Sequence, residues 1–285
     1  YFGGRLINCM SNGNETHLMC RDTTLLRTST DFWPGLPESH GAHLYCNAQV
    51  GMWFGQLIHP DWDMFQSNHE RGAFHAAGRA ISGGPVYVSD KPDGHNFDVL
   101  RKLVLSDGSV LRAERPGLPT RDCLFHDVTQ EDVLLKIWNT NPGGTAVVGV
   151  FHCQYHAEAG ERHEIAGQVT APVTGAVFAH NARTVRRVTR DEEIPVRLPE
   201  GGWEIFTFAR IENGFAALGL ADKYNSGAAV VGNRLRDGGE FVAWCDRSPR
   251  GVTVNGTTVE FSFADGALWV RVPVGGGTLR VDFTG

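Results

Sequence analysis

The sequence predicts an α/β fold that is followed by an all-β region. In residues 1–105, short apolar runs alternate with stretches of helical spacing, which is typical of a parallel sheet or a (β/α) barrel. From about residue 120, short β-type runs are separated by turns rich in glycine and proline, which is typical of an antiparallel sandwich or barrel. The chain of 285 residues is long enough for two domains, and we place them at residues 1–119 and 120–285.

The first region is expected to contain strands and helices in alternation. Residues 5–10 and 24–27 are predicted to be buried strands, and residues 42–57 a helix with apolar and small residues at helical spacing. After the tight segment 59–65, residues 68–82 form a second predicted helix, which Gly83 and Gly84 end. Residues 85–89 are expected to be another buried strand, and residues 97–105 a last short helix.

The second region is expected to contain only strands, after a linker at residues 114–121 that is rich in proline and arginine. Asn255-Gly256 lies between two β-branched runs and is the strongest hairpin signal in the chain. The predicted strands are residues 134–138, 146–151, 176–178, 203–209, 215–220, 241–244, 252–254, 259–263, 268–272 and 279–283.

The composition excludes several classes of partner. Hydrophobic residues make up 41% and charged residues 20% of the chain, as in ordinary globular proteins. The net charge of -6 and the lack of a basic run argue against a nucleic-acid partner, and no apolar stretch is long enough to span a membrane. The six cysteines include no C-x-x-C pair, so we expect free buried thiols, which favours a cytoplasmic location without fixing it.

Polar side chains follow each predicted strand of the first region. In a (β/α) barrel the functional residues lie at the C-terminal ends of the strands, so four such strand ends predict one shared pocket. Each residue alone is equally typical of a helix cap or a loop anchor. The candidates are Cys9 and Met10, then Arg27 and Asp31, then Asp61 and Asp63, and finally Asp90.

The densest of these groups is Asp61-Trp62-Asp63. In an extended stretch His59, Asp61 and Asp63 would share one face, which permits a metal site with one imidazole and two carboxylates. No further ligand cluster is evident, so we expect no metal and no organic cofactor. A sugar site fits better, with a carboxylate that accepts bonds from vicinal hydroxyls and with the indole of Trp62 against the ring. The motifs of serine hydrolases, P-loop enzymes, dinucleotide-binding enzymes and zinc proteases do not occur.

Three segments carry a specific resemblance to a known family. They are Arg27-Thr-Ser-Thr-Asp31-Phe-Trp-Pro, Pro60-Asp-Trp-Asp-Met-Phe-Gln-Ser67 and Gly83-Gly-Pro-Val-Tyr-Val-Ser-Asp-Lys-Pro92. They resemble the raffinose synthase and alkaline α-galactosidase (seed imbibition protein) family of glycoside hydrolase family 36. Weaker matches at residues 102–112, 119–125, 134–139, 148–151 and 219–226 extend the resemblance over nearly the whole chain.

The resemblance implies a retaining α-galactosidase or galactosyltransferase with a (β/α)8 barrel and a C-terminal β-domain. This chain would supply strands five to eight of the barrel and an antiparallel β-sandwich. The family's acid/base is an Asp four residues after an Arg at the end of the sixth strand, which implies Asp31 as catalytic residue and Arg27 as a substrate-site residue. Asp63 would line the galactose pocket from the seventh strand, and Cys9 would do so from the fifth.

One departure from the family pattern concerns the nucleophile. The family uses an Asp in a Lys-x-Asp segment on the fourth strand, and no such segment precedes Cys9. A retaining glycosidase needs two carboxyl groups roughly 5–5.5 Å apart. We therefore expect that the chain is the C-terminal part of a longer enzyme and is inactive alone. Thr30 stands where many members have a second Asp, but Asp31 keeps the fourth-residue position.

The sequence thus predicts an α-galactosidase-type glycoside hydrolase that acts on raffinose-family oligosaccharides or related α-galactosides. The alternative is a galactosyltransferase of the raffinose synthase type that uses galactinol as donor, because the same carboxylates serve both reactions. A second alternative is a non-catalytic carbohydrate-binding protein, which the β-region alone would permit. The expected partner is a galactose-containing oligosaccharide.

Overall fold

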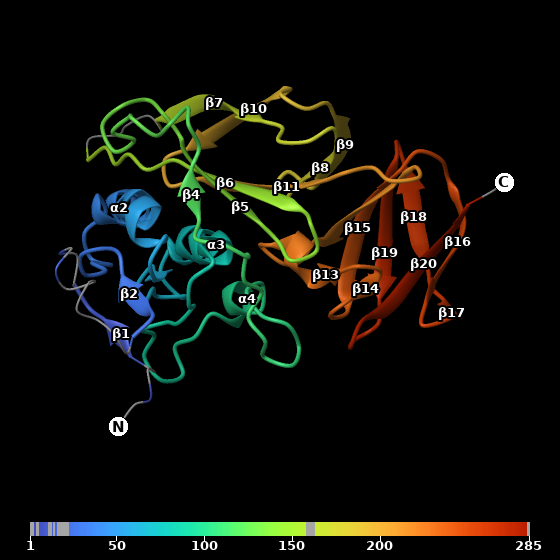
Figure 1. The fold of residues 1–285 in the computed structure, drawn as a ribbon, viewed down its shortest axis with the longest axis horizontal. Helices are drawn as coiled ribbons and strands as arrows, with labels where there is room; N and C mark the ends of the chain where they lie inside the picture. The colour runs from blue at the N-terminus through green and yellow to red at the C-terminus, as the bar shows by residue number, and fades with distance from the viewer. Residues whose placement is uncertain are drawn as a thin grey trace.

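The structure is a computed structural model that describes residues 6–10, 23–157 and 163–283, together with Gly3, Gly13 and Glu15. A small parallel sheet and its helices form the N-terminal part, and antiparallel sheets form the rest (Figure 1). The two ends of the chain lie on opposite sides of the molecule.

The N-terminal sheet consists of three parallel strands in the order β1-β2-β3. They are β1 (Ile7–Asn8), β2 (Leu25–Arg27) and β3 (His59–Asp61). Leu25 pairs with Ile7 on one side and with His59 on the other, and Arg27 pairs with Asp61. This pairing brings the C-terminal ends of β2 and β3 together, as the α/β prediction requires.

In the described part of this region, three helices accompany the strands. The long helix α2 (Ser39–Phe54) connects β2 to β3, and α3 (Gly72–Ser82) and the single turn α4 (Phe97–Leu100) follow β3. Gly83 ends α3 in the left-handed region with a φ of 73°. The predicted helix end at Gly83 therefore agrees with the structure. Helix α2 lies three residues earlier than the predicted 42–57, α3 begins at residue 72 instead of 68, and of the helix predicted at 97–105 only residues 97–100 are helical.

Two predicted buried strands of this region are wrong in part. Of the strand predicted at residues 5–10, residue 5 lies outside the described residues, and within residues 6–10 only β1 forms, with Leu6 and Ile7 exposed. Residues 85–89 form no strand; a single parallel bridge joins Val88 to Phe65, and the segment is half-buried. These residues continue the parallel arrangement without a regular ladder.

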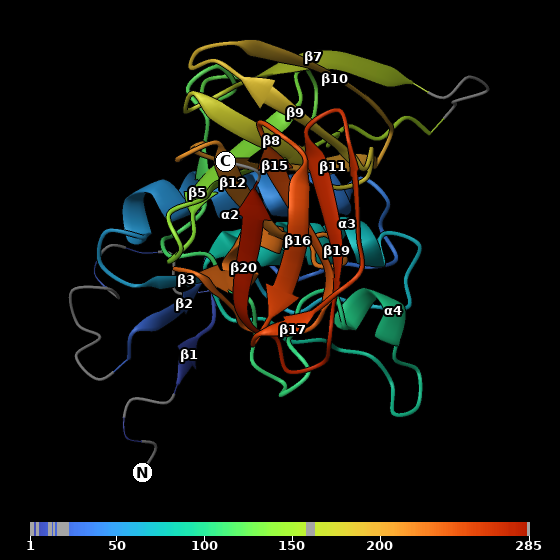
Figure 2. The same cartoon turned by 90° about the vertical axis from the view of Figure 1, so that its right-hand side faces the viewer.

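The C-terminal part contains four antiparallel sheets (Figures 1 and 2). A six-stranded sheet has the order β4-β5-β6-β11-β8-β9, and the pair β10-β7 covers one of its faces. A four-stranded sheet, β12-β15-β19-β18, packs on a five-stranded sheet, β13-β14-β20-β16-β17. The strands are β4 (Leu118–Pro119), β5 (Leu135–Thr140), β6 (Ala146–Phe151), β7 (Glu164–Thr170), β8 (Gly175–Ala179), β9 (Thr184–Val188), β10 (Glu193–Pro199), β11 (Trp203–Ala209), β12 (Phe215–Leu220), β13 (Val230–Val231), β14 (Arg234–Leu235), β15 (Gly239–Cys245), β16 (Pro249–Val254), β17 (Thr257–Thr258), β18 (Phe261–Ala264), β19 (Ala267–Val272) and β20 (Gly277–Phe283), with one 3-10 turn (Ser226–Ala229).

The all-β prediction for this region is confirmed, but it contains two packed units instead of one sandwich. We call the unit made by β12 to β20 the C-terminal sandwich. The predicted Asn255-Gly256 hairpin joins β16 to β17, and both residues have positive φ, 51° and 80°. The boundary predicted after residue 119 stays a prediction; Leu118 and Pro119 themselves pair with β5.

The core of the N-terminal part continues into the six-stranded sheet. Helix α3 contributes Phe74 and Ile81 to the same cluster of buried side chains as Ile137, Phe151 and Ile205 from β5, β6 and β11. The polar side chain of Asn225 also reaches this helix, since its amide donates to the carbonyl of Ala80 at 3.3 Å. The helices that flank the parallel strands are therefore held from the other side by the β-region.

The cysteines agree with the predicted thiols only in part. No disulfide joins the five cysteines that the structure describes, and Cys123, Cys153 and Cys245 are buried as expected. Cys9 is exposed and Cys46 is half-buried, whereas Cys20 lies outside the described residues. In the described part of the chain, no helix has the length and apolar character needed to cross a membrane.

Candidate functional site

Arg27 links two carboxylates at the ends of the parallel strands. Its Nη2 lies 2.8 Å from Asp31 Oδ1, and its Nη1 lies 3.5 Å from Asp63 Oδ2. The Arg27 side chain is 6% exposed, so its hydrogen bonds are shielded from water, while the Asp31 side chain is 51% exposed. Burial acts to lower the pKa of Arg27, but Asp63 and the bond to Asp31 outweigh it and raise that pKa. Arg27 is therefore a fixed cation between an accessible carboxylate and a buried one.

Asp63 has a backbone in the left-handed region and a carboxylate that accepts a backbone hydrogen bond on each oxygen. Its φ is 64°, in the left-handed region, which costs roughly 1–2 kcal/mol for an L-residue. One carboxylate oxygen accepts from the backbone N–H of Phe32 at 2.9 Å, and the other accepts from the N–H of Met64 at 2.9 Å. These contacts fix the carboxylate against the segment that carries Asp31. The positive φ and the hydrogen bonds together fix the position of this carboxylate.

Asp61 lies deeper than Asp63 and is fully buried. It accepts a bond of 2.7 Å from the hydroxyl of Tyr87 and one of 3.0 Å from the backbone N–H of Asp63. Burial raises the pKa of Asp61, against the opposing effect of the Tyr87 bond, and burial together with Asp61 raises the pKa of Tyr87. Asp61 thus stabilises the turn at Asp63 by accepting its backbone N–H. Its other partner, Tyr87, comes from the segment that follows α3.

Trp62 does not have the role that the sequence suggested. Its side chain is 0% exposed and packs in the core beside Leu44 and Gly78. The chain turns at Asp63, so the residues of this segment do not alternate as in an extended strand. The indole has no free face for a sugar ring, and the exposed aromatic nearest to Asp31 in the chain is Trp33, at 54%. We therefore leave Trp62 out of the proposed site.

Cys9 and His59 are both exposed. Cys9 follows β1, and it is among the groups whose charge raises the pKa of Arg27. His59 does not share a buried face with Asp61 and Asp63, because only the two carboxylates are buried. Within the ranges that the structure describes, no group of three or more His, Cys, Asp or Glu side chains is arranged to hold a metal ion.

A second arginine, Arg79 on α3, lies on the core side of the same loop. Its Nη2 donates to the carbonyl oxygens of Trp62 at 2.6 Å, Met64 at 3.2 Å and Asp63 at 3.3 Å. Arg79 is 1% exposed, and burial lowers its pKa to about 10, with Asp63 and Asp61 opposing that change. The loop of residues 62–64 is therefore bound by Arg27 from the open side and by Arg79 from the core.

Sequence reasoning did not single out Arg79, Tyr87 or the backbone of Phe32. Arg79 is four residues after His75 in a helix that is otherwise rich in alanine, and two polar residues one helical turn apart on a buried face are the signal that could have found it. Tyr87 occurs in the third resemblance segment but appeared there only as part of a buried strand. Asp90 accepts from the N–H and hydroxyl of Ser67 and so anchors the loop after β3.

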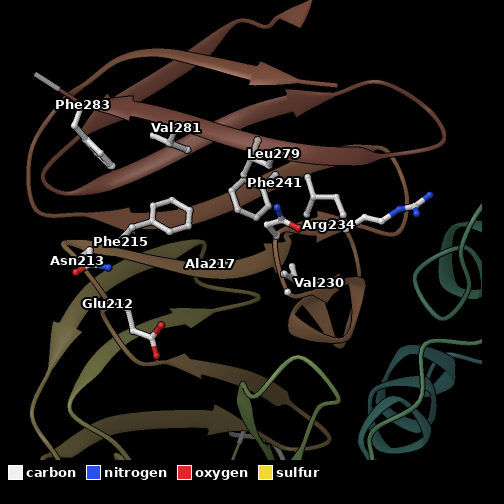
Figure 3. A pocket seen from close by; sticks show the side chains of 13 residues that line it. Glu212, Asn213, Phe215, Ala217, Val230, Arg234, Phe241, Leu279, Val281 and Phe283 are labelled. Carbon is white, nitrogen blue, oxygen red and sulfur yellow. The ribbon is translucent and has the colours of Figure 1, made fainter. Parts of the chain in front are cut away.

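A separate cavity lies in the C-terminal sandwich, far along the chain from Asp31. It has a volume of about 440 Å³ and opens between the two sheets of this sandwich (Figure 3). Phe215, Phe241 and Phe283 point into it, and Glu212 and Arg234 stand at its edge. Among the residues that line it, Glu212 is the one carboxylate, so this cavity does not resemble the paired carboxylates at the strand ends.

The arrangement at the strand ends suits proton transfer next to a polar ligand. Asp31 is accessible to a ligand, and Arg27 fixes its position. Asp63 presents a carboxylate that already accepts two backbone bonds and can accept hydroxyl donors on its remaining lone pairs. The described residues thus provide one accessible carboxylate and one buried carboxylate, both in contact with Arg27.

Comparison with known proteins finds one family along most of the chain. Residues 1–183 match the family described as raffinose synthase or seed imbibition protein Sip1. The chain is 37% identical to a galactinol–sucrose galactosyltransferase of Oryza sativa subsp. japonica, over 98% of this chain and 42% of that protein. It is 32% identical to a stachyose synthase of Pisum sativum, over 95% of this chain and 38% of that protein. The chain thus spans about two fifths of the length of these relatives.

Among solved structures, a putative α-galactosidase from Bacteroides fragilis resembles the fold. The TM-score is 0.51 with 13% sequence identity, and the match covers 72% of this chain and 47% of that chain. At this identity the likeness concerns the fold alone. It agrees with a partial barrel that is joined to a β-domain.

Proposed function

Because the chain belongs to the raffinose synthase and seed imbibition protein family, we propose that it supplies the acid/base half of a site that transfers galactosyl groups between sugars. The preferred reaction is transfer from galactinol to an acceptor such as sucrose, and hydrolysis of α-galactosides is the second candidate. This order reverses the one drawn from the sequence, because the matched relatives are named as galactosyltransferases and a stachyose synthase.

The observation that carries the proposal is the contact of Arg27 with both Asp31 and Asp63. Asp31 donates a proton to the glycosidic oxygen that leaves and then removes the proton from the incoming hydroxyl. Arg27 keeps the Asp31 carboxylate in one place during both steps. Asp63 accepts hydrogen bonds from hydroxyls of the galactose ring, and Cys9 borders the same pocket.

The chemistry needs a second carboxylate as nucleophile, at roughly 5–5.5 Å from the first. We assign that role to a residue outside this sequence, in a preceding part of the longer protein. Asp61 is not a candidate, because it is fully buried and bonded to Tyr87. Water or a sugar hydroxyl can serve as the acceptor at the same carboxylates, so the acceptor side of the pocket decides between hydrolysis and transfer.

The test is Asp31→Asn in the longer protein, with two donors that differ in leaving group. Turnover of galactinol should fall by roughly 10²–10⁴-fold, while an aryl galactoside with an acidic leaving group should keep most of its first-step rate. Measuring galactose release against galactosyl-sucrose formation in the wild type separates hydrolysis from transfer. Equal loss on both donors, or no loss on either, would show that Asp31 is not the acid/base.

A further inference from the structure

A buried network on the core side of the site connects helices α2 and α3 to the loop of residues 62–64. Arg79 and His75 come from α3, and His40 and His43 come from α2. All four side chains are at most 6% exposed. None of them reaches the open side of the strand ends, so the acid/base chemistry of Asp31 does not explain why a cation is buried here.

The donors and acceptors of the chain from Arg79 through His75 to His40 are fixed by the guanidinium, which can only donate. Arg79 can only donate, so His75 Nδ1 accepts its Nη1–H at 2.8 Å. The other ring nitrogen of His75 then carries the hydrogen and donates to His40 Nδ1 at 2.7 Å. Burial, and next the charge of Arg79, hold the pKa of His75 well below its usual range, which keeps this ring neutral and the order of bonds intact.

The acceptors of Arg79 are neutral groups. They are the three carbonyl oxygens of residues 62–64 and Nδ1 of His75. Nη2 also lies 3.1 Å from Nε2 of His43, which accepts from Arg79 when it carries no hydrogen and otherwise donates to the carbonyl of Trp62 at 3.0 Å. A buried guanidinium normally pairs with a carboxylate, because neutral acceptors compensate less of its lost hydration. Three consecutive carbonyls that point at one cation require the chain to turn sharply, and the turn is the one at which Asp63 has a φ of 64°.

We propose that Arg79 is a positioning residue that sets the backbone of residues 62–64 and thereby the carboxylate of Asp63, and that His75 fixes the orientation of its guanidinium. The proposal rests on the proposed function insofar as Asp63 contacts the sugar. Arg27 binds the Asp63 side chain and Arg79 binds the Asp63 segment, so the two arginines act on one loop from opposite sides. Lysine cannot replace Arg79, since a single ammonium cannot span the carbonyls and His75 together.

The first experiment needs no enzymatic activity. Hydrogen exchange, followed by mass spectrometry on peptides that cover residues 60–67, compares the wild type with Arg79→Lys. The matched control is Asn225→Ser, which removes a buried side-chain bond to the same helix at Ala80. We expect exchange of these peptides to become about tenfold faster in R79K and to change less than about twofold in N225S. Unchanged exchange in R79K, or equal acceleration in both variants, overturns the proposal.

The second experiment is a double-mutant cycle with Asp63→Asn in the longer protein. R79K should lower kcat/KM for galactosyl transfer by about 10–100-fold when Asp63 is present, and by less than about threefold in the Asp63→Asn background. The same factor in both backgrounds overturns the link through Asp63. If the wild type itself shows no galactosyl transfer or hydrolysis, the proposed function fails, while the exchange experiment still decides the role of Arg79.

A second pair of variants serves if R79K does not fold. His75→Gln offers Arg79 an oxygen acceptor and offers His40 an N–H donor, so exchange of residues 60–67 should remain near that of the wild type. His75→Leu offers neither group and should accelerate that exchange by about tenfold. Equal exchange in the two His75 variants overturns the orienting role of His75.

Discussion

The ends of the parallel strands and the C-terminal sandwich differ in what their buried positions contain. At the strand ends, Arg27, Asp61 and Asp63 are buried, and Asp63 has a strained backbone. In the strands of the C-terminal sandwich the buried side chains are apolar, for example Phe241 and Val252, and its buried polar side chains lie in the segments between strands, as Asn225 and Asp237 do. Buried charge and strain add little to stability, whereas apolar burial contributes most of it. The comparison teaches that stability and chemistry depend on different parts of this chain.

The largest effect that separates the two regions is expected for Phe241→Ala. Phe241 is fully buried in the C-terminal sandwich, and its removal should lower the free energy of unfolding by about 3–5 kcal/mol. Urea unfolding measures this change. In the longer protein, galactosyl transfer per folded molecule should stay at the wild-type level, and a loss of transfer in fully folded protein would contradict the separation.

A smaller effect is expected for Arg27→Lys in the longer protein, and here activity should fall while stability changes little. One ammonium cannot keep both contacts of the guanidinium, to Asp31 at 2.8 Å and to Asp63 at 3.5 Å. We expect kcat/KM for transfer to fall by about 10²-fold, with little change in the urea midpoint. Arg187→Lys is the control, since Arg187 forms an exposed ion pair with Asp246. If both variants kept full activity, Arg27 would have no part in the site.

The histidines of the core side predict a pH dependence of stability. Burial, and next the charge of Arg79, lower the pKa of His43 from 6.5 to about 3. Above pH 6.5 the ring is neutral in both states and contributes nothing. Between pH 6.5 and about 3 the unfolded chain binds a proton at this ring that the folded chain does not bind. As the pH is lowered through this range, the free energy of unfolding therefore falls by up to about 1.4 kcal/mol per pH unit.

Urea unfolding at a series of pH values between 6.5 and 4 measures this slope. His43→Gln should reduce this slope by the share that His43 contributes, because glutamine does not titrate. An identical slope in the variant and the wild type would show that His43 is not protonated more easily in the unfolded chain.

The smallest effect is expected in the hairpin of the C-terminal sandwich. Gly256 has a φ of 80°, and no atom would lie within 4 Å of an added Cβ, so Gly256→Ala should cost about 1 kcal/mol through backbone strain alone. Gly35→Ala is matched in space but has no positive φ, and it should leave the free energy of unfolding unchanged or slightly higher. Equal losses in both would argue against backbone strain as the cause.

The sequence was a good guide to the fold where apolar residues run together. The predicted strands at 146–151, 203–209 and 215–220 coincide with β6, β11 and β12. The sequence missed β7, β9 and β10, in which most side chains are exposed or half-buried and only one or two per strand are buried. Such strands have no continuous apolar run, so a search for runs passes over them.

At the site, resemblance and spacing brought Arg27, Asp31 and Asp63 to one place, and the structure puts Arg27 in contact with both carboxylates. Whether they act as assigned stays a prediction. Trp62 could not be judged from its neighbours, because the turn at Asp63 breaks the alternation that would have exposed it. Arg79 was missed because its partners are backbone carbonyls, which every residue possesses.

The left-handed backbone of Asp63 also limits which amino acids evolution can use at this position. Glycine adopts a φ near 64° without strain, and asparagine and aspartate adopt it at a lower cost than other residues do. Of these, aspartate alone offers Arg27 a negative charge. Glutamate would keep the charge but would not readily adopt the left-handed backbone conformation. In a saturation library at residue 63, selection for folding should therefore remove the residues that do not adopt this backbone. Selection for turnover should then remove glycine and asparagine, so that only aspartate passes both selections.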